Sequence, residues 1–254
     1  MFRSPSGTGT RATVPPPYPG ATDTWSVTTY AGLCSHFWAP TPQATPAAGQ
    51  WDVNGTATQT SCHGNYNGHG AYVNTTASVA VPLNGSLFGG TVSVRLKVTT
   101  LATWNITEAP WCLGYGLSYV ECFESANFTD VAYLELLDNT TGSVVATGGA
   151  ASPHAYWWTA PNASNVWIDV VSNNSVRAMY MRTGAINGQI AVTSTPDLSI
   201  RVPKGYVLNA SHEYEVVVVG GFEIQAAADS VEAVFHEWSN VHDEVGFTIV
   251  SMSM

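Results

Sequence analysis

Charged residues are scarce in this chain of 254 residues. Only 10% of them are Asp, Glu, Lys or Arg, whereas an ordinary soluble domain carries roughly 25%. Lys and Arg number 8 against 18 Asp and Glu, so the formal net charge is −10. A nucleic-acid-binding surface needs clustered Lys and Arg to neutralise phosphates, and a polybasic membrane-surface binder needs them to meet anionic lipid headgroups. The charge balance therefore excludes both classes of protein.

Long apolar runs are also missing. A membrane-spanning helix needs about 20 consecutive apolar residues, but the longest run, around Val216 to Val219, has the size of one strand. Residues 1–7 contain no apolar segment of the kind found in secretory signal peptides. They also do not begin the long apolar helix of a type IV pilin. We expect no membrane insertion, and the sequence leaves open whether a signal peptide was removed.

Familiar catalytic motifs are missing as well. There is no Gly-x-Ser-x-Gly elbow and no Gly-rich phosphate loop. His236 and His242 are two positions too far apart for the His-Glu-x-x-His zinc motif, which places both imidazoles on one helical face. His63 and His69 bracket a Gly-rich loop (64–68), where a metal site remains the alternative to solvent-facing histidines. We expect no metal and no other cofactor.

Paired carboxylates are the one sign of hydrolytic chemistry. A glycoside hydrolase needs two of them, and Glu213 and Glu215 share one face of an expected strand. Neither these nor Glu121, Glu124 and Glu135 fall in a recognisable glycosidase motif, and two carboxylates on one strand face are usually just solvated. We therefore expect that the chain is not an enzyme. In the alternative, Glu213 and Glu215 would be its acid and base.

Glycosylation sequons are abundant in place of charge. With 15 Asn and 50 Ser and Thr in the chain, chance would give roughly three Asn-x-Ser/Thr acceptors. The sequence contains nine, at Asn54, Asn74, Asn84, Asn105, Asn127, Asn139, Asn162, Asn173 and Asn209. We expect several of them to carry glycans and each modified one to mark a solvent-facing loop or strand edge. Neutral, hydrated sugar would then replace charge as the means of staying soluble, and the sequon-free ends would be left for neighbouring subunits.

The cysteine content agrees with an exported protein. There are four, Cys34, Cys62, Cys112 and Cys122, with no Cys-x-x-Cys pair. An even number suits an oxidising compartment, and local loops favour pairing Cys34 with Cys62 and Cys112 with Cys122. Three pairings are possible, and free thiols in a cytosolic protein are the alternative. We expect an extracellular protein at the surface of a cell or virion.

Alternating apolar and polar residues dominate the chain after a Pro/Gly/Ser/Thr-rich start. Residues 1–22 have the composition of an extended arm. Residues 23–254 are predicted to form one antiparallel, all-β sandwich, jelly-roll-like, with at most one short helix. That helix would be Asp229–Trp238, which could equally be a bent strand. The expected strands cover Thr24–Tyr30, Tyr72–Val81, Val92–Thr99, Val131–Leu137, Val144–Thr147, Val166–Val171, Val176–Arg182, Leu198–Val202, Tyr214–Val219 and Phe247–Met252.

Tryptophan is the richest remaining signal, with nine residues. Trp157 and Trp158 are adjacent, and on a strand they point to opposite faces, so at most one belongs to the core. The other would contact a neighbouring subunit or a sugar, or cover the edge of the core. We predict both as subunit-contact residues.

Two classes of function remain. The first is an extracellular, glycosylated structural subunit that binds other copies of itself and forms a surface filament, pilus-like fibre or coat. Its support is the low-complexity arm, the sequon-free ends and the missing catalytic motifs. The second is a secreted carbohydrate-binding module or glycoside hydrolase on a lectin-like sandwich.

Strand donation is the mechanism expected for the first class. Thr24–Tyr30 is the most strand-like segment beside the arm and would complete the sheet of an adjacent subunit. Trp25, Val27 and Thr29 are therefore predicted subunit contacts, and the last strand, Gly246–Met252, is the expected acceptor edge. Head-to-tail contacts of this kind generate open polymers.

Overall fold

The computed structural model describes residues 13–14, 17–31, 35–60, 70–83, 90–107, 123–151, 155–159, 168–172, 177–180, 185–229 and 238–254. The four cysteines lie outside these residues, as do His63, His69, Asn84, Asn162 and Asn173. The predicted disulfides and the loop metal site therefore stay predictions.

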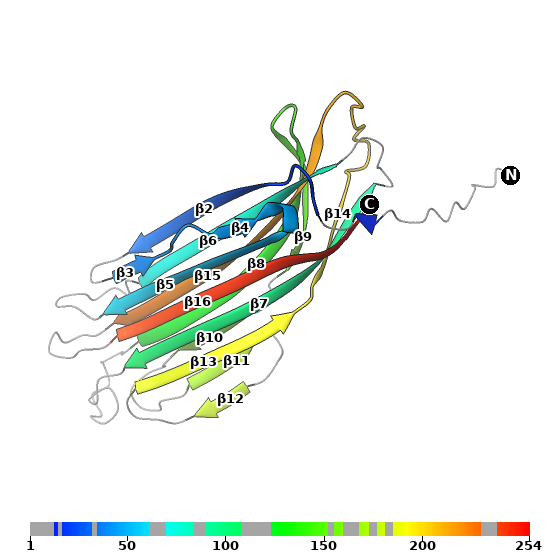
Figure 1. Cartoon of the computed structure of the whole chain (residues 1–254). Coiled ribbons are helices and arrows are strands. Elements are labelled where there is room, and N and C mark those ends of the chain that lie inside the picture. The colour runs from blue at the N-terminus through cyan, green and yellow to red at the C-terminus, as the bar shows by residue number, and fades with distance from the viewer. Residues whose placement is uncertain are drawn as a thin grey trace.

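Two antiparallel sheets of eight strands each are stacked into a sandwich (Figure 1). Three long strands form the middle of the first, sheet A: β7 (Thr91–Thr107), β16 (Trp238–Ser253) and β5 (Gln50–Thr60). Shorter strands flank them: β3 (Ser35–Trp38) and β4 (Gln43–Thr45) beside β5, β13 (Ala185–Ser194) and β14 (Asp197–Arg201) beside β7, and β1 (Thr13–Val14) beside the end of β16.

The second sheet, sheet B, is also built on three long strands. They are β8 (Phe123–Asp138), β15 (Tyr214–Asp229) and β6 (Gly70–Leu83), with β15 in the middle. Strand β2 (Thr22–Ala31) closes the β6 side. The other side carries β9 (Ser143–Ala151), β10 (Ala155–Thr159), β11 (Ile168–Ser172) and β12 (Arg177–Tyr180).

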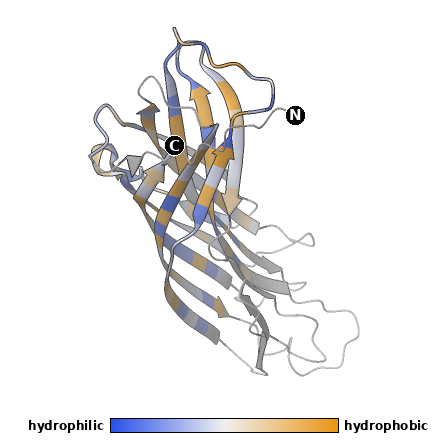
Figure 2. Cartoon of the chain, turned by 90° about the vertical axis from the view of Figure 1, so that its right-hand side faces the viewer, coloured by the Kyte–Doolittle hydropathy of each residue, from blue (hydrophilic) through white to orange (hydrophobic). Residues whose placement is uncertain are grey.

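The period-2 sequence pattern explains why both sheets form. Buried and more exposed residues alternate along β5 and along β6 from Ala71 to Ala77, and Figure 2 shows the corresponding orange and blue bands along the strands. Each strand therefore turns one apolar face inward and one polar face outward. The all-β antiparallel sandwich predicted from this pattern is confirmed. The helical structure among the described residues is a short 3₁₀ turn, Pro46–Ala48.

Aromatic residues of each sheet pack over glycines of the other. A Cβ atom on Gly55 of β5 would come within 2.8 Å of the Phe222 ring of β15, and one on Gly220 of β15 within 2.7 Å of the Phe247 ring of β16. Phe247 also stacks on Trp51 with ring centroids 5.2 Å apart. The glycines let large rings enter the space between the sheets, which is the close packing that stabilises a sandwich core.

The structure bears on two expectations about the ends of the chain. Gly246–Met252 is not an acceptor edge, because β16 lies between β7 and β5 and pairs with both. Thr24–Tyr30 is a strand as predicted, within β2, and it pairs with β6 of the same chain. Inside the expected arm, Tyr18 is buried and donates its backbone N–H to Ala47 O.

The rest of the region 229–238 lies outside the described residues, with Asp229 ending β15 and Trp238 beginning β16. Among the residues that the structure describes, no helix is long and apolar enough to cross a membrane.

Candidate functional site

A groove on the outer face of sheet B is the strongest candidate site. It crosses β2, β6, β15 and β8, and its volume is about 450 Å³. We call it the sheet B groove and define it by its lining residues: Thr22, Thr24, Trp25, Ser26, Thr76, Ala77, Ser78, Ala80, Tyr133, Glu135, Leu137, Asn139, Glu215, Val217 and Val219. A second hollow of about 360 Å³, lined by Asn74, Val131, Ala150 and Glu223 among others, shares Thr76 and Tyr133 with it.

Strand register explains why a groove forms here. Opposite Val219 of β15 lie Ser78 on β6 and Tyr133 on β8. Opposite Val217 lie Ala80 and Glu135. In each row a small side chain on β6 faces a large one on β8, so the outer surface is low over β6 and raised over β8.

Glu215 is the residue of the groove that most calls for a ligand. Glu215 is only 9% exposed. Within the described part of the chain, its carboxylate accepts no hydrogen bond. Burial raises the pKa of Glu215, and the nearby charge of Glu213 raises it further. A buried carboxylate without a partner costs free energy. A bound group that donates hydrogen bonds would remove that cost.

Tyr133 and Glu135 lie on the neighbouring strand β8, opposite Val219 and Val217 of β15. Both are on the outward-facing, half-exposed positions of β8, and Glu135 is the diagonal neighbour of Glu215 across the β8–β15 pair. Burial raises the pKa of Tyr133, with a further rise from the charge of Glu135. The Tyr133 phenol therefore stays neutral and can donate its proton in a hydrogen bond.

Hydroxyl groups line the opposite wall. Thr24 Oγ1 lies 2.6 Å from Ser78 Oγ, and Ser26 Oγ lies 2.6 Å from Thr76 Oγ1, each pair joining β2 to β6. In each pair one hydroxyl hydrogen is used in the mutual bond and the other remains available. No Lys or Arg is among the described residues that line the groove. The wall therefore offers neutral donors and acceptors and carboxylates, which suits an uncharged ligand rich in hydroxyls.

The outer face of sheet A is polar in a different way, because its side chains bond to one another. Thr58 Oγ1 donates to Asn240 Oδ1 at 2.6 Å. Thr56 Oγ1 lies 2.8 Å from His242 Nδ1, and His242 Nε2 lies 3.0 Å from Glu244 Oε1. The order of groups resembles a catalytic triad, but it arises from direct cross-strand opposition of Thr56 and His242. Both ring nitrogens are occupied, so the histidine is held in a ladder.

Two aspartates are buried between the sheets. Asp130 of β8 and Asp243 of β16 are both fully buried, and Thr100 Oγ1 donates to Asp130 Oδ2. Burial raises the pKa of Asp243 well above its usual value, and the charge of Asp130 and a hydrogen bond to it act in the same direction. The surroundings of Asp243 therefore favour its protonated, uncharged form inside the core. Groups of three or more metal-ligand side chains do not occur among the described residues.

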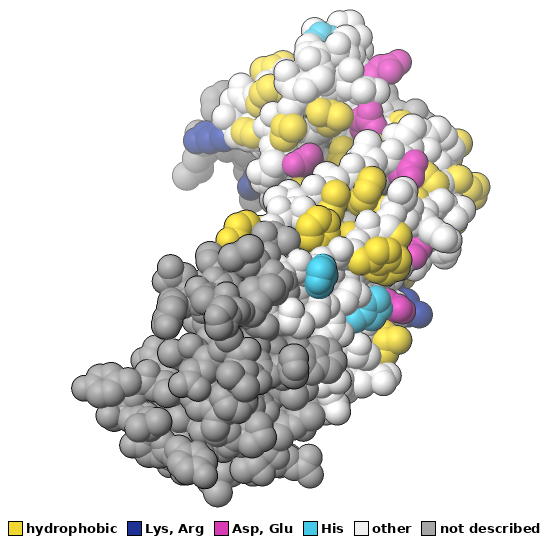
Figure 3. Space-filling view, turned by 90° about the vertical axis from the view of Figure 1, so that its left-hand side faces the viewer, with side chains coloured by type: hydrophobic (Ala, Val, Ile, Leu, Met, Phe, Trp, Pro, Cys, Tyr) yellow, Lys and Arg dark blue, Asp and Glu magenta, His cyan; other side chains and the backbone are white. Residues whose placement is uncertain are grey.

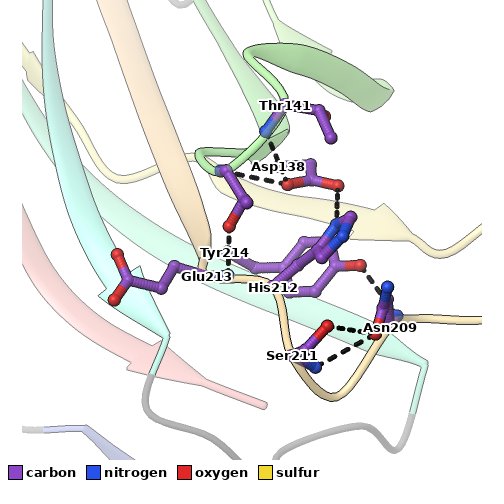
Figure 4. Close-up of polar contacts among 8 residues, drawn as sticks. Asp138, Thr141, Asn209, Ser211, His212, Glu213 and Tyr214 are labelled. Atoms are coloured by element: carbon purple, nitrogen blue, oxygen red, sulfur yellow. Dashed lines mark hydrogen bonds and ion pairs between the residues drawn. The ribbon is translucent and has the colours of Figure 1, made fainter.

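A polar cluster closes one end of the sandwich (Figure 4). Asp138, at the end of β8, accepts a bond from His212 Nδ1 at 2.7 Å and from the backbone N–H of Thr140 and Thr141. Burial would raise the pKa of Asp138, but the bonds from His212 and Thr141 outweigh it and keep the pKa below its usual value. The Asp138–His212 pair ties the turn after β8 to the loop before β15.

The sequence-predicted carboxylate pair is only partly assembled by the structure. Glu215 lies in the sheet B groove, whereas Glu213 precedes β15 and is not among the lining residues. Glu135, from the adjacent strand, takes the place beside Glu215 that sequence reasoning gave to Glu213. Tyr133 was missed. The signal that could have found it is the alternation in β8 of outward Tyr133 and Glu135 with inward Leu134.

The predicted subunit-contact residues of β2 are exposed. Trp25 is 41% and Val27 40% exposed, and Thr29 is half-buried. Trp25 is opposite the buried Ala77, so its side chain belongs to the inner side of the sheet although its backbone borders the groove. Trp157 and Trp158 lie on β10, opposite Asn127 and Ala126 of β8.

The predicted sequons do not all occupy loops or edges. Asn139 and Asn209 are in exposed turns and loops. Four others stand within long strands of the two sheets: Asn54, Asn74, Asn105 and Asn127. The expected glycans stay predictions. A sheet with a solvated outer face can hold Asn and Thr at every second position, so a sequon does not by itself mark a loop.

Comparison with known proteins adds little beyond the architecture. No model of a known protein family matches the chain, and no curated protein matches it. Two similar solved structures are described as carbohydrate-binding modules of the β-sandwich superfamily (11% identity, TM-score 0.21, 84% of this chain) and as a family 11 carbohydrate-binding module from Clostridium thermocellum in complex with a mixed-linked tetrasaccharide (8% identity, TM-score 0.12, 80% of this chain). The aligned part spans 57% of the first chain and 95% of the second.

Proposed function

We propose that this protein binds a neutral carbohydrate in the sheet B groove. The observation that carries the proposal is Glu215 in the groove wall: the residue is only 9% exposed, and its carboxylate has no hydrogen-bond partner among the described residues. Sugar hydroxyls donate hydrogen bonds to carboxylates, and such charge-assisted bonds are the stronger kind. A sugar would therefore supply the hydrogen bonds that Glu215 lacks within the described part of the protein.

The rest of the groove supports the same class of ligand. Tyr133 offers a ring face and a phenolic hydroxyl, which together suit the mixed apolar and polar surface of a pyranose. The Thr24–Ser78 and Ser26–Thr76 pairs offer further hydroxyl partners. Phosphorylated or sulfated ligands are disfavoured, because two carboxylates and no cation line the groove.

Binding is tested by a matched pair of variants on a glycan array, followed by calorimetry with the best ligand. Glu215→Gln keeps the shape but removes the charge, and we expect at least a tenfold loss of affinity, since a hydrogen bond to a charged group contributes about 1.5–3 kcal/mol. Glu244→Gln, on the exposed outer face of sheet A, is the control and is expected to bind like the unaltered protein. Equal affinities for the two variants, or no binding of any neutral glycan, would overturn the proposal. A reducing-sugar assay in the same experiment separates binding from hydrolysis.

We also propose a second function, self-assembly as an extracellular structural subunit, on a separate observation. Strand β2 is a sheet edge of ten residues with no buried side chain among those described. Five of the nine large apolar residues exposed in the described structure lie on β2 and on β3, the neighbouring edge of sheet A: Trp25, Val27, Tyr30, Phe37 and Trp38. Figure 3 shows such apolar side chains on a surface with few charges. A strand that bonds along its backbone yet buries little is suited to exchange between copies.

Strand exchange is tested by a disulfide trap. Ser26 and Thr76 touch through their hydroxyls across the β2–β6 pair, so Ser26→Cys with Thr76→Cys should cross-link under oxidation. If β2 is donated, the double variant forms covalent multimers on a non-reducing gel, whereas each single variant does not. A cross-linked monomer alone would show that β2 stays in its own subunit and would overturn this second function.

A further inference from the structure

The described sequons differ in whether the side-chain amide nitrogen of the asparagine faces solvent. N-glycosylation joins C1 of a sugar to Asn Nδ2. The co-reactant is a glycosyl phosphate donor: its C1–O bond to phosphate breaks, the Nδ2–C1 bond forms, and Nδ2 loses one proton as the phosphate carrier leaves. The modified Nδ2 keeps one hydrogen. The sugar takes the place of the other hydrogen, and that position must face bulk solvent so that the glycan can extend from it. This requirement can be read from the hydrogen bonds of each amide.

We propose that Asn209 and Asn139 are the glycosylated members of the six sequons described, and that Asn54, Asn74, Asn105 and Asn127 remain unmodified. The proposal does not rest on carbohydrate binding, although Asn139 is also one of the residues that line the sheet B groove. It places both glycans in turns and loops and leaves the strands of the two outer faces unmodified.

Asn209 has the side-chain geometry that its sequon calls for. Its Oδ1 accepts the backbone N–H of Ser211 at 3.0 Å and the Ser211 hydroxyl at 2.8 Å. Because a backbone N–H must meet an acceptor, the oxygen and nitrogen of this amide are assigned without ambiguity. The oxygen is tied to the turn, so Nδ2 points away from it, and the residue is exposed. The hydroxyl that polarises the amide belongs to the third sequon residue, which explains the need for Ser or Thr there.

Asn139 stands in the exposed turn between β8 and β9. Its backbone N–H donates to Glu213 O at 2.9 Å, and its side chain has no hydrogen bond to another described residue. The turn is held by Asp138, whose Oδ1 accepts the backbone N–H groups of Thr140 and Thr141. The Asp138–His212 bond brings this turn next to the Asn209 loop, as Figure 4 shows. A glycan at either residue leaves the same end of the molecule.

The four strand-borne asparagines are half-buried within long strands. Asn74 donates Nδ2 to Glu223 Oε1 at 3.1 Å, so modification would remove one of its donor hydrogens and place sugar inside the hollow beside the groove. The Oδ1 atoms of Asn54, Asn105 and Asn127 are buried. Asn105 and Asn127 each have a paired strand on both sides, and Asn54 is paired with β16. All three residues are half-buried, whereas Asn139 and Asn209 are exposed, and this difference in exposure separates the two groups.

Glycopeptide mass mapping of the protein from its native host tests the assignment. We expect sugar on the peptides of Asn139 and Asn209 and unmodified masses for those of Asn54, Asn74, Asn105 and Asn127. Ser211→Ala should remove the glycan at Asn209, whereas Ser211→Thr should keep it. Asn127→Gln is the matched control and should leave the intact glycoprotein unchanged apart from the substitution itself.

Three results would overturn the proposal. One is sugar on any of the four strand-borne residues, and another is a chain without sugar on either Asn139 or Asn209. The third is a Ser211→Ala protein that keeps its glycan at Asn209. Each result is read from mass alone, so carbohydrate binding by the groove does not affect it.

Discussion

Polar side chains occupy alternate positions on the outer faces of both sheets, but the two faces differ in whether these side chains have hydrogen-bond partners. On sheet A, Thr56, His242 and Glu244 form a continuous chain of hydrogen bonds. On sheet B, Glu215 is more deeply buried than Glu244 and has no such chain. A face whose polar groups bond to one another has little to offer a ligand, whereas a face with an unpaired buried group gains free energy when a ligand supplies the partner. Polarity alone therefore does not identify a binding face.

The largest expected effect comes from adding a methyl group to a glycine of each sheet. A Cβ atom on Gly221 of sheet B would lie 2.1 Å from the Thr75 carbonyl oxygen, which is backbone and cannot turn away. On Gly246 of sheet A it would lie 2.8 Å from Thr99 Oγ1, the end of a side chain. We expect Gly221→Ala to lower the free energy of unfolding by about 3 kcal/mol and Gly246→Ala by about 1 kcal/mol. Urea unfolding followed by tryptophan fluorescence measures both, and a reversed order would contradict the comparison.

The next effect concerns the acids that the two sheets place in the core. Because the folded-state pKa of Asp243 lies well above its unfolded value, folding favours its protonated form. Its contribution to stability is therefore complete below the unfolded pKa of about 3.9 and is lost as the pH rises through the folded pKa. Asp130 of β8 and Glu244 of β16 are the charged groups that raise this pKa.

We expect the midpoint of thermal unfolding to fall as the pH rises from 4 toward 7. Asp243→Asn keeps the shape and cannot lose the proton, so its midpoint should change much less over that range. The groups with lowered pKa values, Asp138 and Asp197, act in the opposite direction and remain in both proteins. A variant whose midpoint follows the pH like the unaltered protein would remove Asp243 as the cause.

A smaller effect compares one carboxylate of each outer face directly. Glu215→Gln removes a buried charge without a partner, so we expect it to raise the free energy of unfolding at pH 7 by about 1 kcal/mol. Glu244→Gln removes a partner of His242 from an exposed pair and should lower it by at most about 0.5 kcal/mol. Opposite signs in chemical denaturation at pH 7 are the expected result. The same sign for both would mean that the two faces are equally satisfied.

The smallest effect is expected at the one Arg–Asp pair in the described structure. Arg95 Nε lies 2.7 Å from Asp197 Oδ1, with side chains 54% and 64% exposed. Exposed pairs of this kind contribute little because solvent and salt screen them. We expect Arg95→Gln to leave the thermal midpoint unchanged within error in 0.5 M salt. A clear loss of stability there would show that surface charge matters more in this chain than its scarcity indicates.

The sandwich could be predicted because its signal is local. Residues such as Val92, Val94 and Leu96 alternate with polar neighbours, and each is buried as expected. The same locality misled the placement of the last strand, since Phe247 and Ile249 read equally well as an edge or a central strand. Strand order depends on which segments meet across the fold, and β16 pairs with β5 and β7 from distant parts of the chain.

Only part of the candidate site could be predicted from the sequence. Glu215 was recognised as a carboxylate on a strand face, but its partner in the groove is Glu135, from another strand. The spacing of Glu213 and Glu215 suggested a pair, whereas the boundary of β15 separates them. Two residues on different strands become neighbours through register, which no single segment encodes.

By itself the sequence determined the period of the strands, the low charge and the positions of the sequons, because these depend on residues close together in the chain. Only the tertiary structure decided which polar groups satisfy one another and which do not. His242 and Glu215 look alike as polar residues in strands. One meets Thr56 across a strand pair, and the other meets no partner among the described residues, since hydrogen-bond satisfaction depends on distances between segments far apart in sequence.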